Sequence, residues 1–382
     1  MKKIIRAVTA SRSLGFVEGM LPDLREKYEV VLLSSPGEKM DVLTKEYGVK
    51  GIGVSMERRI SVIKDLKALI KVIRVFRKEK PTMVHSMTPK AGMLCMVAGW
   101  VTRVPVRVHT FTGLVWPTST GLKRWILMLT DWLTCACATH IIPEGEGVKS
   151  DLLNYGITHK SLKVLGYGNV RGVDMARFSR RQEVLEIVEQ NDLKSHDCFT
   201  FLFVGRIVRD KGINELVEAF VRLHKRYPQT KLWLVGGAED ELDPISDKTR
   251  MAIKLCEAIE AVGRKYGDEL LACYSAADCY ISPSYREGFP NTVLEAGAMG
   301  LPSIVTDING SREIIKQGEN GLIVPSKDAD ALFDAMLKMV REKDEWERMA
   351  SNARQMIADR FEQGFVRKCL YDFYESILPT TA

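Results

Sequence analysis

Several features that mark other protein classes are missing from this chain of 382 residues. The longest stretch without a charged residue spans the fifteen residues 108–122 and contains Gly113 and Pro117, whereas a membrane-spanning helix needs about 18 apolar residues in a row. The eight cysteines include no C-x-x-C pair, which argues against a zinc site and against a disulfide framework. Neither half opens with G-x-G-x-x-G after its first expected strand, which disfavours a dinucleotide dehydrogenase. We therefore expect a reduced, cytoplasmic protein.

Charge is distributed unevenly between the two halves of the chain. Residues 1–180 hold 29 Lys and Arg against 15 Asp and Glu, or +14, and residues 181–382 hold 26 against 34, or −8, which together give the net +6. Such asymmetry predicts that the first half faces an anionic surface or substrate. The acidic second half gives no sign of nucleic-acid binding.

Short β-rich segments alternate with helical ones along the whole chain, a pattern typical of parallel sheets covered by helices on both faces. The fold class predicted is α/β, with two Rossmann-like, doubly wound parallel-sheet domains facing a cleft. A charged, weakly apolar segment at 175–197 is expected to join them, so the domains are placed at 1–175 and 176–382. The expected strands are 4–9, 29–34, 83–86, 106–110, 200–204, 231–235, 279–282 and 301–306, and the expected helices include 15–27, 60–78 and 91–101.

In such sheets ligands bind at the carboxyl ends of the strands, so functional residues are expected in the loops there. After the strand 200–204 come Gly205-Arg206 and then Lys211-Gly212, just before a helix. A glycine, two cations and a helix N-terminus together favour a bound diphosphate. A solvated turn with ordinary surface cations is the alternative for this loop alone.

A second loop, residues 284–297, follows the strand 279–282 and places Glu287 and Glu295 around a glycine-proline turn. Gly288 permits a close backbone approach, and Asn291 suits the start of a helix. Carboxylates accept paired hydroxyl hydrogen bonds, so the two acids fit the two polyols of a nucleotide sugar. The alternative is a helix N-terminus with favourable acidic residues, which does not account for the turn.

These loops, with others in the same order, resemble the retaining GT-B glycosyltransferases of family 4. Glu287 and Glu295 have the E-x7-E spacing of that family. Besides the loop within 204–212, the resemblance covers three further segments along the chain, namely 172–178, 307–314 and 320–325.

The resemblance implies a role for each matching residue. Glu287 would contact the donor sugar as a catalytic residue, and Glu295 would bind the ribose. Arg206 and Lys211 would hold the diphosphate, and leaving-group stabilisation by such donors would make a metal unnecessary. The same turn would add Gly288 and the backbone N–H groups of Phe289, Asn291 and Thr292. No cofactor is expected, because the nucleotide sugar is a substrate.

Residues 84–92 and 108–114 resemble the members that build capsule, O-antigen and related surface polysaccharides. They suggest acceptor-side contacts from His85, Lys90 and Thr112, although many members have His where this chain has Thr112.

His109 stands where the strand 106–110 ends and would contact the donor sugar or a developing charge. A structural role is the alternative for a histidine at such a position. Gly15, after the first strand, would approach the donor, and the last helices, about 360–382, would pack back on the first domain.

The resemblance thus predicts transfer of a sugar from a nucleotide sugar, expected to be a UDP-sugar, to a hydroxyl of an undecaprenyl-diphosphate-linked glycan. Two alternatives remain open from the residues: a UDP-sugar 2-epimerase of similar fold, and a non-catalytic glycan-binding protein.

The helix expected at 60–78 is relevant to whether the protein lies on a membrane. Its apolar residues fall on one face and its lysines on a neighbouring stripe. Such a helix either lies on an anionic membrane, here the inner face of the cytoplasmic membrane, or packs its apolar face into the core. The segment 125–129, preceded by Lys123 and Arg124, is a second candidate for membrane contact.

Overall fold

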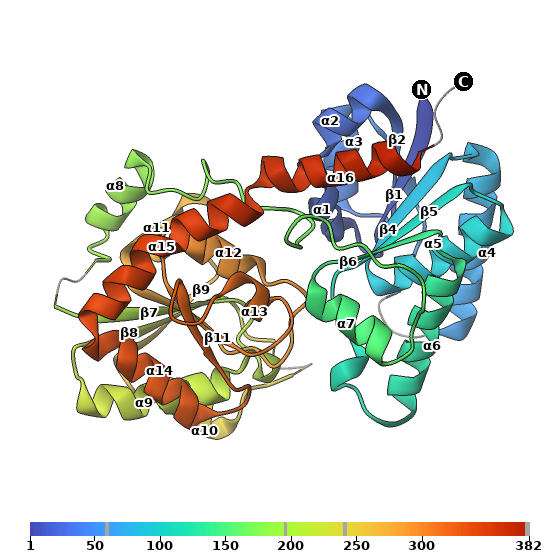
Figure 1. Ribbon diagram of the computed structural model, residues 1–382. Coiled ribbons are helices and arrows are strands. Elements are labelled where there is room, and N and C mark those ends of the chain that lie inside the picture. The colour runs from blue at the N-terminus through green and yellow to red at the C-terminus, as the bar shows by residue number, and fades with distance from the viewer. Residues whose placement is uncertain (58–60, 195–196, 240–242, 379–382) are drawn as a thin grey trace. The chain divides into compact units, whose positions relative to one another are not determined.

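The computed structural model describes residues 1–57, 61–194, 197–239 and 243–378 (Figure 1). The chain divides into two compact units: the first comprises residues 1–172 and 364–382, and the second residues 173–363. The predicted boundary at 175 lies close to residues 172 and 173, where the chain first passes from one unit to the other. In the described part of the chain, no helix is both long and apolar enough to cross a bilayer.

The first unit is built on a six-stranded sheet with the order β3-β2-β1-β4-β5-β6, in which every pairing is parallel. This is the doubly wound order, whose direction reverses between β1 and β4. Its strands are β1 (Lys2–Ala7), β2 (Tyr28–Ser34), β3 (Lys50–Gly53), β4 (Met83–Met87), β5 (Val106–Phe111) and β6 (His140–Pro143).

Alternation along β1 separates two cores in the first unit. Ile5 and Ala7 join the core under α4, α5 and α6, whereas Ile4 joins the core under α1, α2, α3 and α16, because successive side chains of a strand point to opposite faces. The helices are α1 (Gly15–Glu18), α2 (Leu21–Lys27), α3 (Glu38–Tyr47), α4 (Val62–Glu79), α5 (Pro89–Val101), α6 (Gly121–Cys137), α7 (Glu146–Asn154) and α16 (Gln363–Ile377), with 3-10 turns η1 (Ser11–Leu14) and η2 (Trp116–Thr118).

The second unit repeats this plan with the order β12-β11-β10-β7-β8-β9, again with parallel pairings. The predicted fold class, two doubly wound parallel-sheet units, is confirmed. The strands are β7 (Phe199–Val204), β8 (Thr230–Val235), β9 (Ile259–Gly263), β10 (Cys279–Ser282), β11 (Ser303–Thr306) and β12 (Gly321–Val324). The helices are α8 (Gln182–Gln190), α9 (Ile213–Arg226), α10 (Asp247–Leu255), α11 (Gly267–Ala276), α12 (Asn291–Ala298), α13 (Ser311–Ile314), α14 (Ala329–Arg341) and α15 (Lys343–Phe361), with the 3-10 turn η3 (Arg209–Lys211).

Two expectations about single elements need correction. The helix predicted at 15–27 is broken into α1 and α2, and Pro22 stands in the first turn of the second piece, where proline is tolerated. The segment expected to link the domains, 175–197, belongs to the second unit instead and contains α8, and its residues 195–196 lie outside the described part. Ile60, the predicted start of the long basic helix, also lies outside it, and α4 begins at Val62.

Candidate functional site

The two predicted donor loops follow neighbouring strands of the second sheet. β7 and β10 pair in parallel, with Phe201 opposite Cys279, so the loops after them emerge at the same edge. The strand order reverses between these two strands, and a doubly wound sheet binds ligands at that reversal. The topology therefore brings the two loops to the expected place for a ligand.

Glycine at 212 allows the first loop to pack on the second. Gly212 has a left-handed backbone, with φ of 71°, and ends η3 just before α9 begins. A Cβ atom there would lie 2.0 Å from the carbonyl oxygen of Pro283, which is far inside van der Waals contact. The backbone N–H of Tyr285 also donates to the carbonyl of Asp210 at 2.9 Å. The two loops thus form one packed unit.

Lys211 and Glu287 meet at this junction. The Lys211 ammonium forms an ion pair with Oε1 of Glu287, and Oγ of Ser284 donates to the same oxygen at 2.8 Å. Both charged side chains are about four-fifths buried. A cation and a carboxylate are thereby fixed side by side at the end of β10, with the acid held from two directions.

Arg206 lies on the same loop as Lys211 but has a different partner. Its guanidinium pairs with Glu239 at 2.8 Å and is about half exposed, so the structure does not bring Arg206 into contact with Glu287. Arg286, next to Glu287, pairs instead with Asp210 at 3.1 Å.

The start of α12 supplies the remaining predicted donor residues. Asn291 and Thr292 occupy its first two positions, where backbone N–H groups point out of the helix end. Phe289 is buried and packs edge-on against Phe361. At Gly310 a Cβ would lie 2.3 Å from the carbonyl oxygen of Gly288, so the glycine-proline turn is held tightly against the loop after β11.

Glu295 lies about one turn into α12 and is held by a buried phenol. The Tyr274 hydroxyl donates to Oε2 of Glu295 at 3.3 Å. Burial, followed by the charge of Glu295, raises the pKa of Tyr274 well above its usual range, so this phenol stays protonated and keeps donating. The second acid therefore has a fixed orientation, as Glu287 does.

Sequence reasoning missed Ser284, Glu239 and the glycine that ends β8. Gly236 has φ of 152°, and a Cβ there would lie 1.7 Å from the carbonyl oxygen of Gly205. The Gly-Gly pair directly after a predicted strand was the available signal. Nothing in the pattern identified Ser284, whose partner Glu287 stands three residues further along the same loop, or Glu239, whose partner Arg206 lies on another loop.

In the first unit, His109 is the fourth residue of β5 and is buried. Oγ of Ser86 lies 2.9 Å from its Nδ1, and a Cβ on Gly92 would lie 2.3 Å from its Cε1. Burial lowers the pKa of His109 to about 3, so the ring is neutral at physiological pH. The structure encloses this imidazole between β4, α5 and Phe111.

His85 takes part in a second buried network. Its Nδ1 lies 2.5 Å from the hydroxyl of Tyr374, and its Nε2 lies 2.7 Å from Oγ1 of Thr110. The Arg6 guanidinium, which is buried with 1% of its surface exposed, donates to the same Tyr374 hydroxyl. Both ring nitrogens of His85 therefore have partners inside the first unit, and the structure does not bring this predicted acceptor residue to a surface.

Lys90 borders a cavity of about 560 Å³ at the point where the first strand order reverses. The cavity lies at the N-terminal ends of α4, α5 and α6, and Lys90 pairs there with Asp65 at 2.7 Å.

Gly15 begins α1, and a Cβ on it would meet no protein atom, so packing does not require glycine there. Thr112 directly follows β5 and is partly buried.

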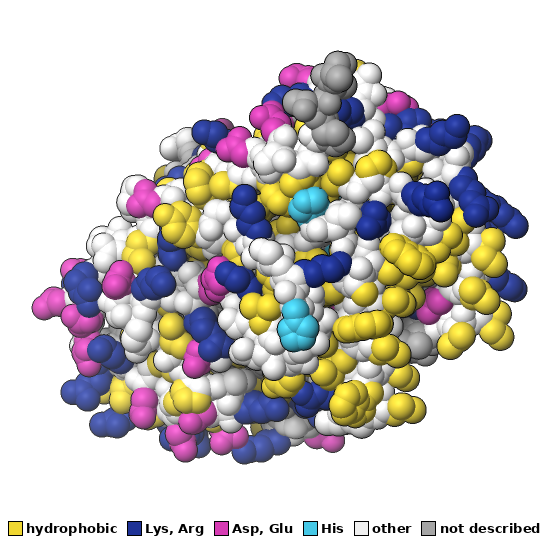
Figure 2. Space-filling view, turned by 45° about the vertical axis from the view of Figure 1, so that its right-hand side comes forward, with side chains coloured by type: hydrophobic (Ala, Val, Ile, Leu, Met, Phe, Trp, Pro, Cys, Tyr) yellow, Lys and Arg dark blue, Asp and Glu magenta, His cyan; other side chains and the backbone are white. Residues whose placement is uncertain are grey.

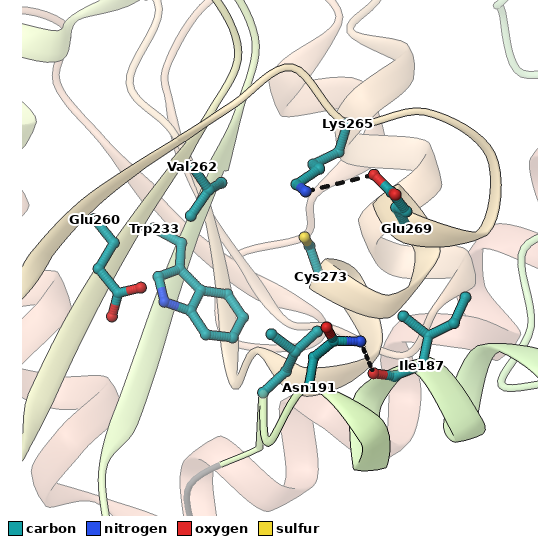
Figure 3. Close-up of a pocket in the computed structure, with 9 residues that line it drawn as sticks. Ile187, Asn191, Trp233, Glu260, Val262, Lys265, Glu269 and Cys273 are labelled. Atoms are coloured by element: carbon teal, nitrogen blue, oxygen red, sulfur yellow. Dashed lines mark hydrogen bonds and ion pairs between the residues drawn. The ribbon is translucent and has the colours of Figure 1, made fainter.

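A second pocket, of about 380 Å³, lies in the second unit between α8, α11 and the face of β8 and β9 (Figure 3). Trp233 forms one wall, and Lys265 pairs with Glu269 at 3.4 Å on the other. None of the predicted site residues lines it. Across the described residues, no cluster of His, Cys, Asp and Glu has the arrangement of a metal site.

Comparison with known families supports the two-unit plan. Residues 186–356 match the family model described as glycosyl transferases group 1, and residues 16–168 match a glycosyl transferase 4-like domain. Among solved structures, the chain resembles Anabaena Alr3699/HepE in complex with UDP, with a TM-score of 0.80 and 16% identity, over 98% of this chain and 100% of that chain. At that identity the likeness concerns the fold.

Two curated proteins are similar in sequence over most of the chain. The capsular polysaccharide biosynthesis glycosyltransferase CapM of Staphylococcus aureus is 31% identical over 379 residues, which cover 99% of this chain and 98% of that protein. The UDP-Gal:alpha-D-GlcNAc-diphosphoundecaprenol alpha-1,3-galactosyltransferase of Escherichia coli is 26% identical over 316 residues, which cover 80% and 78%.

Proposed function

Since this chain belongs to the group 1 glycosyltransferases, we propose that it transfers a hexose-type sugar from a UDP-sugar to a hydroxyl of an undecaprenyl-diphosphate-linked glycan. The anomeric configuration is retained, and the product enters surface-polysaccharide synthesis. The named activity of the E. coli relative supports both the UDP donor and the lipid-linked acceptor. The UDP complex of Alr3699/HepE supports the donor nucleotide.

The observation that carries the proposal is the ion pair of Lys211 and Glu287 at the strand-order reversal of the second sheet. The donor diphosphate binds Lys211 and the N–H groups at the start of α12, and Arg206 turns from Glu239 to the same phosphates. Glu287 accepts hydrogen bonds from sugar hydroxyls, and Glu295 accepts them from the ribose. Each carboxylate is already oriented, by Ser284 and by Tyr274, which lowers the entropic cost of binding.

The chemical step is a displacement on one face of the sugar. The bond between C1 and the diphosphate oxygen breaks, the acceptor oxygen bonds to C1 from the same side, and the departing phosphate takes the acceptor proton. Lys211 and Arg206 stabilise the negative charge that grows on the diphosphate, the task a divalent metal performs in other transferases. The reaction on these residues is therefore metal-independent.

His109 is assigned to this step through its position on β5. Its ring is neutral and enclosed by Ser86 and Gly92, so its contribution is to fix the end of β5 and the following Thr112 where the sugar approaches. Gly15 leaves room for the donor beside α1. A His109→Gln variant that keeps its donor KM but loses kcat would support this role, and an unchanged kcat would contradict it.

The direct test measures UDP release from a panel of UDP-sugars, with and without an undecaprenyl-diphosphate-linked acceptor. Removing one donor to a developing oxyanion costs about 10²–10³ in kcat, and we expect a loss of that order for Lys211→Ala. Glu287→Gln weakens the acceptor for the sugar hydroxyls and is expected to lower turnover as well. Lys343→Ala, at an exposed lysine of α15, is the matched control and keeps wild-type turnover.

The outcomes separate the proposed function from its alternatives. An epimerised sugar formed without acceptor and without UDP release would identify a 2-epimerase. Donor binding without turnover on any acceptor would favour a glycan-binding protein. Normal turnover by the Lys211 and Glu287 variants would refute the site itself.

A further inference from the structure

Helices α4 and α6 flank α5 on one face of the first sheet (Figure 1). The middle of α5 is largely buried, as expected for the central helix of a layer, and its ends are exposed at Pro89 and at Trp100 and Val101. The two outer helices therefore carry most of the solvent-facing surface on this side of the unit.

The surface of α4 has three parts: a core-facing side, an exposed apolar patch at its start, and the stripe of lysines and arginines expected from sequence. Its core-facing side is formed by the small and aromatic residues Ala68, Val72 and Phe76. Leu69 and Ile73 pack against the same core, whereas Val62, Ile63 and Leu66 at the start of the helix are between 57% and 78% exposed. The apolar face of α4 is thus divided: its later residues pack into the core, and its first residues face solvent.

α6 has a matching apolar stripe. Leu122, Trp125, Leu129 and Trp132 recur at intervals of three and four residues, which places them on one side of the helix, and they are between 50% and 76% exposed. Figure 2 shows hydrophobic side chains gathered in a broad area at the right, with Lys and Arg side chains above and beside it. Two exposed tryptophans and five other exposed apolar residues on α4 and α6, namely Val62, Ile63, Leu66, Leu122 and Leu129, far exceed scattered surface hydrophobes.

The charges on these two helices have one sign in solvent. The acids are all engaged internally: Asp65 pairs with Lys90, Glu79 pairs with Lys3 and Lys50, and Asp131 accepts from the indole of buried Trp116. The exposed cations of α4 and α6 that make no ion pair within the described residues are Lys67, Lys71, Arg74, Arg77, Lys78 and Lys123.

We propose that this α4–α6 surface, defined by the two apolar stripes and the cations beside them, docks on an anionic lipid bilayer. Apolar side chains insert at the level of the headgroups, where tryptophan is favoured, and each lysine or arginine near the surface gains attraction from anionic lipid. A second copy of the chain does not fit, because two surfaces with this excess of positive charge repel each other. The inference deepens the proposed function, whose acceptor is lipid-linked, but its evidence is independent of the donor site.

Docking through this surface also positions the cavity of about 560 Å³ beside Lys90. Asp65 of α4 and Lys123, Leu127 and Thr130 of α6 border it, so it lies between the two docking helices. Its walls are apolar along Met93 and Leu127 and cationic at Lys123. A diphosphate on a lipid tail emerging from the bilayer meets both kinds of wall, and its glycan then reaches the carboxyl ends of the first sheet.

The test is sedimentation of the full chain with vesicles, in the absence of donor and acceptor. We expect binding to vesicles of phosphatidylcholine with 30% phosphatidylglycerol, roughly tenfold or more above binding to pure phosphatidylcholine, and weakening in high salt. Because no sugar is present, this result stands or falls separately from the transfer assay.

Two double variants distinguish the contribution of apolar contact to vesicle binding from that of positive charge. Leu66→Ser with Trp125→Ser removes apolar contact, and Lys67→Glu with Lys71→Glu reverses charge. Each pair is expected to reduce binding to anionic vesicles roughly tenfold or more. The matched control, Leu255→Ser on α10, changes a side chain that is 74% exposed in the second unit and leaves vesicle binding unchanged.

Two results would overturn the proposal. One is equal binding of wild type and both double variants to anionic vesicles. The other is a wild-type chain that binds no vesicles but is dimeric in light scattering, with Leu66→Ser/Trp125→Ser monomeric, which would assign the surface to a second copy. Circular dichroism spectra matching wild type establish that the variants are folded.

Discussion

The buried imidazole of His109 makes the first unit sensitive to acid. Burial holds the pKa of this ring at about 3, whereas a histidine in an unfolded chain titrates near 6.5. Below about pH 6.5 the unfolded chain therefore binds a proton that the folded chain excludes, so the free energy of unfolding falls as the pH falls and levels off near pH 3. With these two pKa values, the free energy of unfolding at pH 5 is about 2 kcal/mol lower than at neutral pH because of this ring alone.

His109→Asn removes the titrating group and isolates its contribution. The assay is urea unfolding followed by hydrogen exchange of peptides from β4 and β5, at pH 7.5 and pH 5.0, so that the two units are read separately. The variant is expected to be less stable than wild type at pH 7.5, because Ser86 loses a partner, but to lose about 2 kcal/mol less on acidification. His85, whose pKa burial also lowers well below its usual range, steepens the dependence in both proteins.

The control is His159→Asn, because His159 is exposed and keeps its hydration on folding. It is expected to leave the pH dependence as in wild type. Equal losses for wild type and His109→Asn between the two pH values would refute the reasoning, since the ring would then be protonated inside the folded unit or reached by water.

Three further predictions concern single packing contacts. Gly212→Ala forces a Cβ into a carbonyl of the second donor loop and adds an unfavourable left-handed backbone, so we expect donor KM to rise about tenfold or more, measured by UDP release. Gly92→Ala improves helix propensity but overlaps the ring of His109, so urea unfolding is expected to show a loss of about 1–3 kcal/mol, which the double variant with His109→Ala recovers in part. Tyr374→Phe leaves the buried guanidinium of Arg6 without its hydroxyl partner, and a loss of about 2–3 kcal/mol in the unfolding of the first unit is expected; no loss would mean that water or an ion replaces the phenol.

Sequence reasoning succeeded where an apolar run is short and clearly bounded. β10 was predicted to the residue, because the run 279–282 stands between Asp278 and Pro283. The edge strand β3 was missed: two of its four residues are glycine, and its side chains are mostly exposed, so it has no hydrophobic period to detect.

The sequence left two environments open for the apolar face of α4. A hydrophobic stripe on a helix predicts the face that avoids water, but it does not specify what covers that face. On α4 Val72 and Phe76 lie in the core with Leu69 and Ile73 packed beside them, and Ile63 and Leu66 stay in solvent. No local pattern records where along the helix the neighbouring elements stop covering it.

In the candidate site, sequence identified the residues but not how they pair. The loops around Lys211 and Glu287 could be placed at one sheet edge because parallel strands share an end. That Arg206 pairs with Glu239 depends on side-chain reach across loops after β7 and β8, and that Glu295 is held by Tyr274 depends on how α11 packs on α12. Such distances are properties of the assembled unit.

The first and last residues of the second unit lie close together. The N–H of Val173 donates to the carbonyl of Phe361 at 2.8 Å, and the N–H of Gln363 donates to the carbonyl of Val173 at 3.0 Å. The fragment 173–363 is therefore one uninterrupted stretch whose two ends are tied together, suited to production by itself for nucleotide titration. The other half has no such option: cutting after residue 172 discards α16 and with it Leu370, Phe373 and Tyr374 from its interior, so that half needs its last nineteen residues, 364–382, supplied as a second piece.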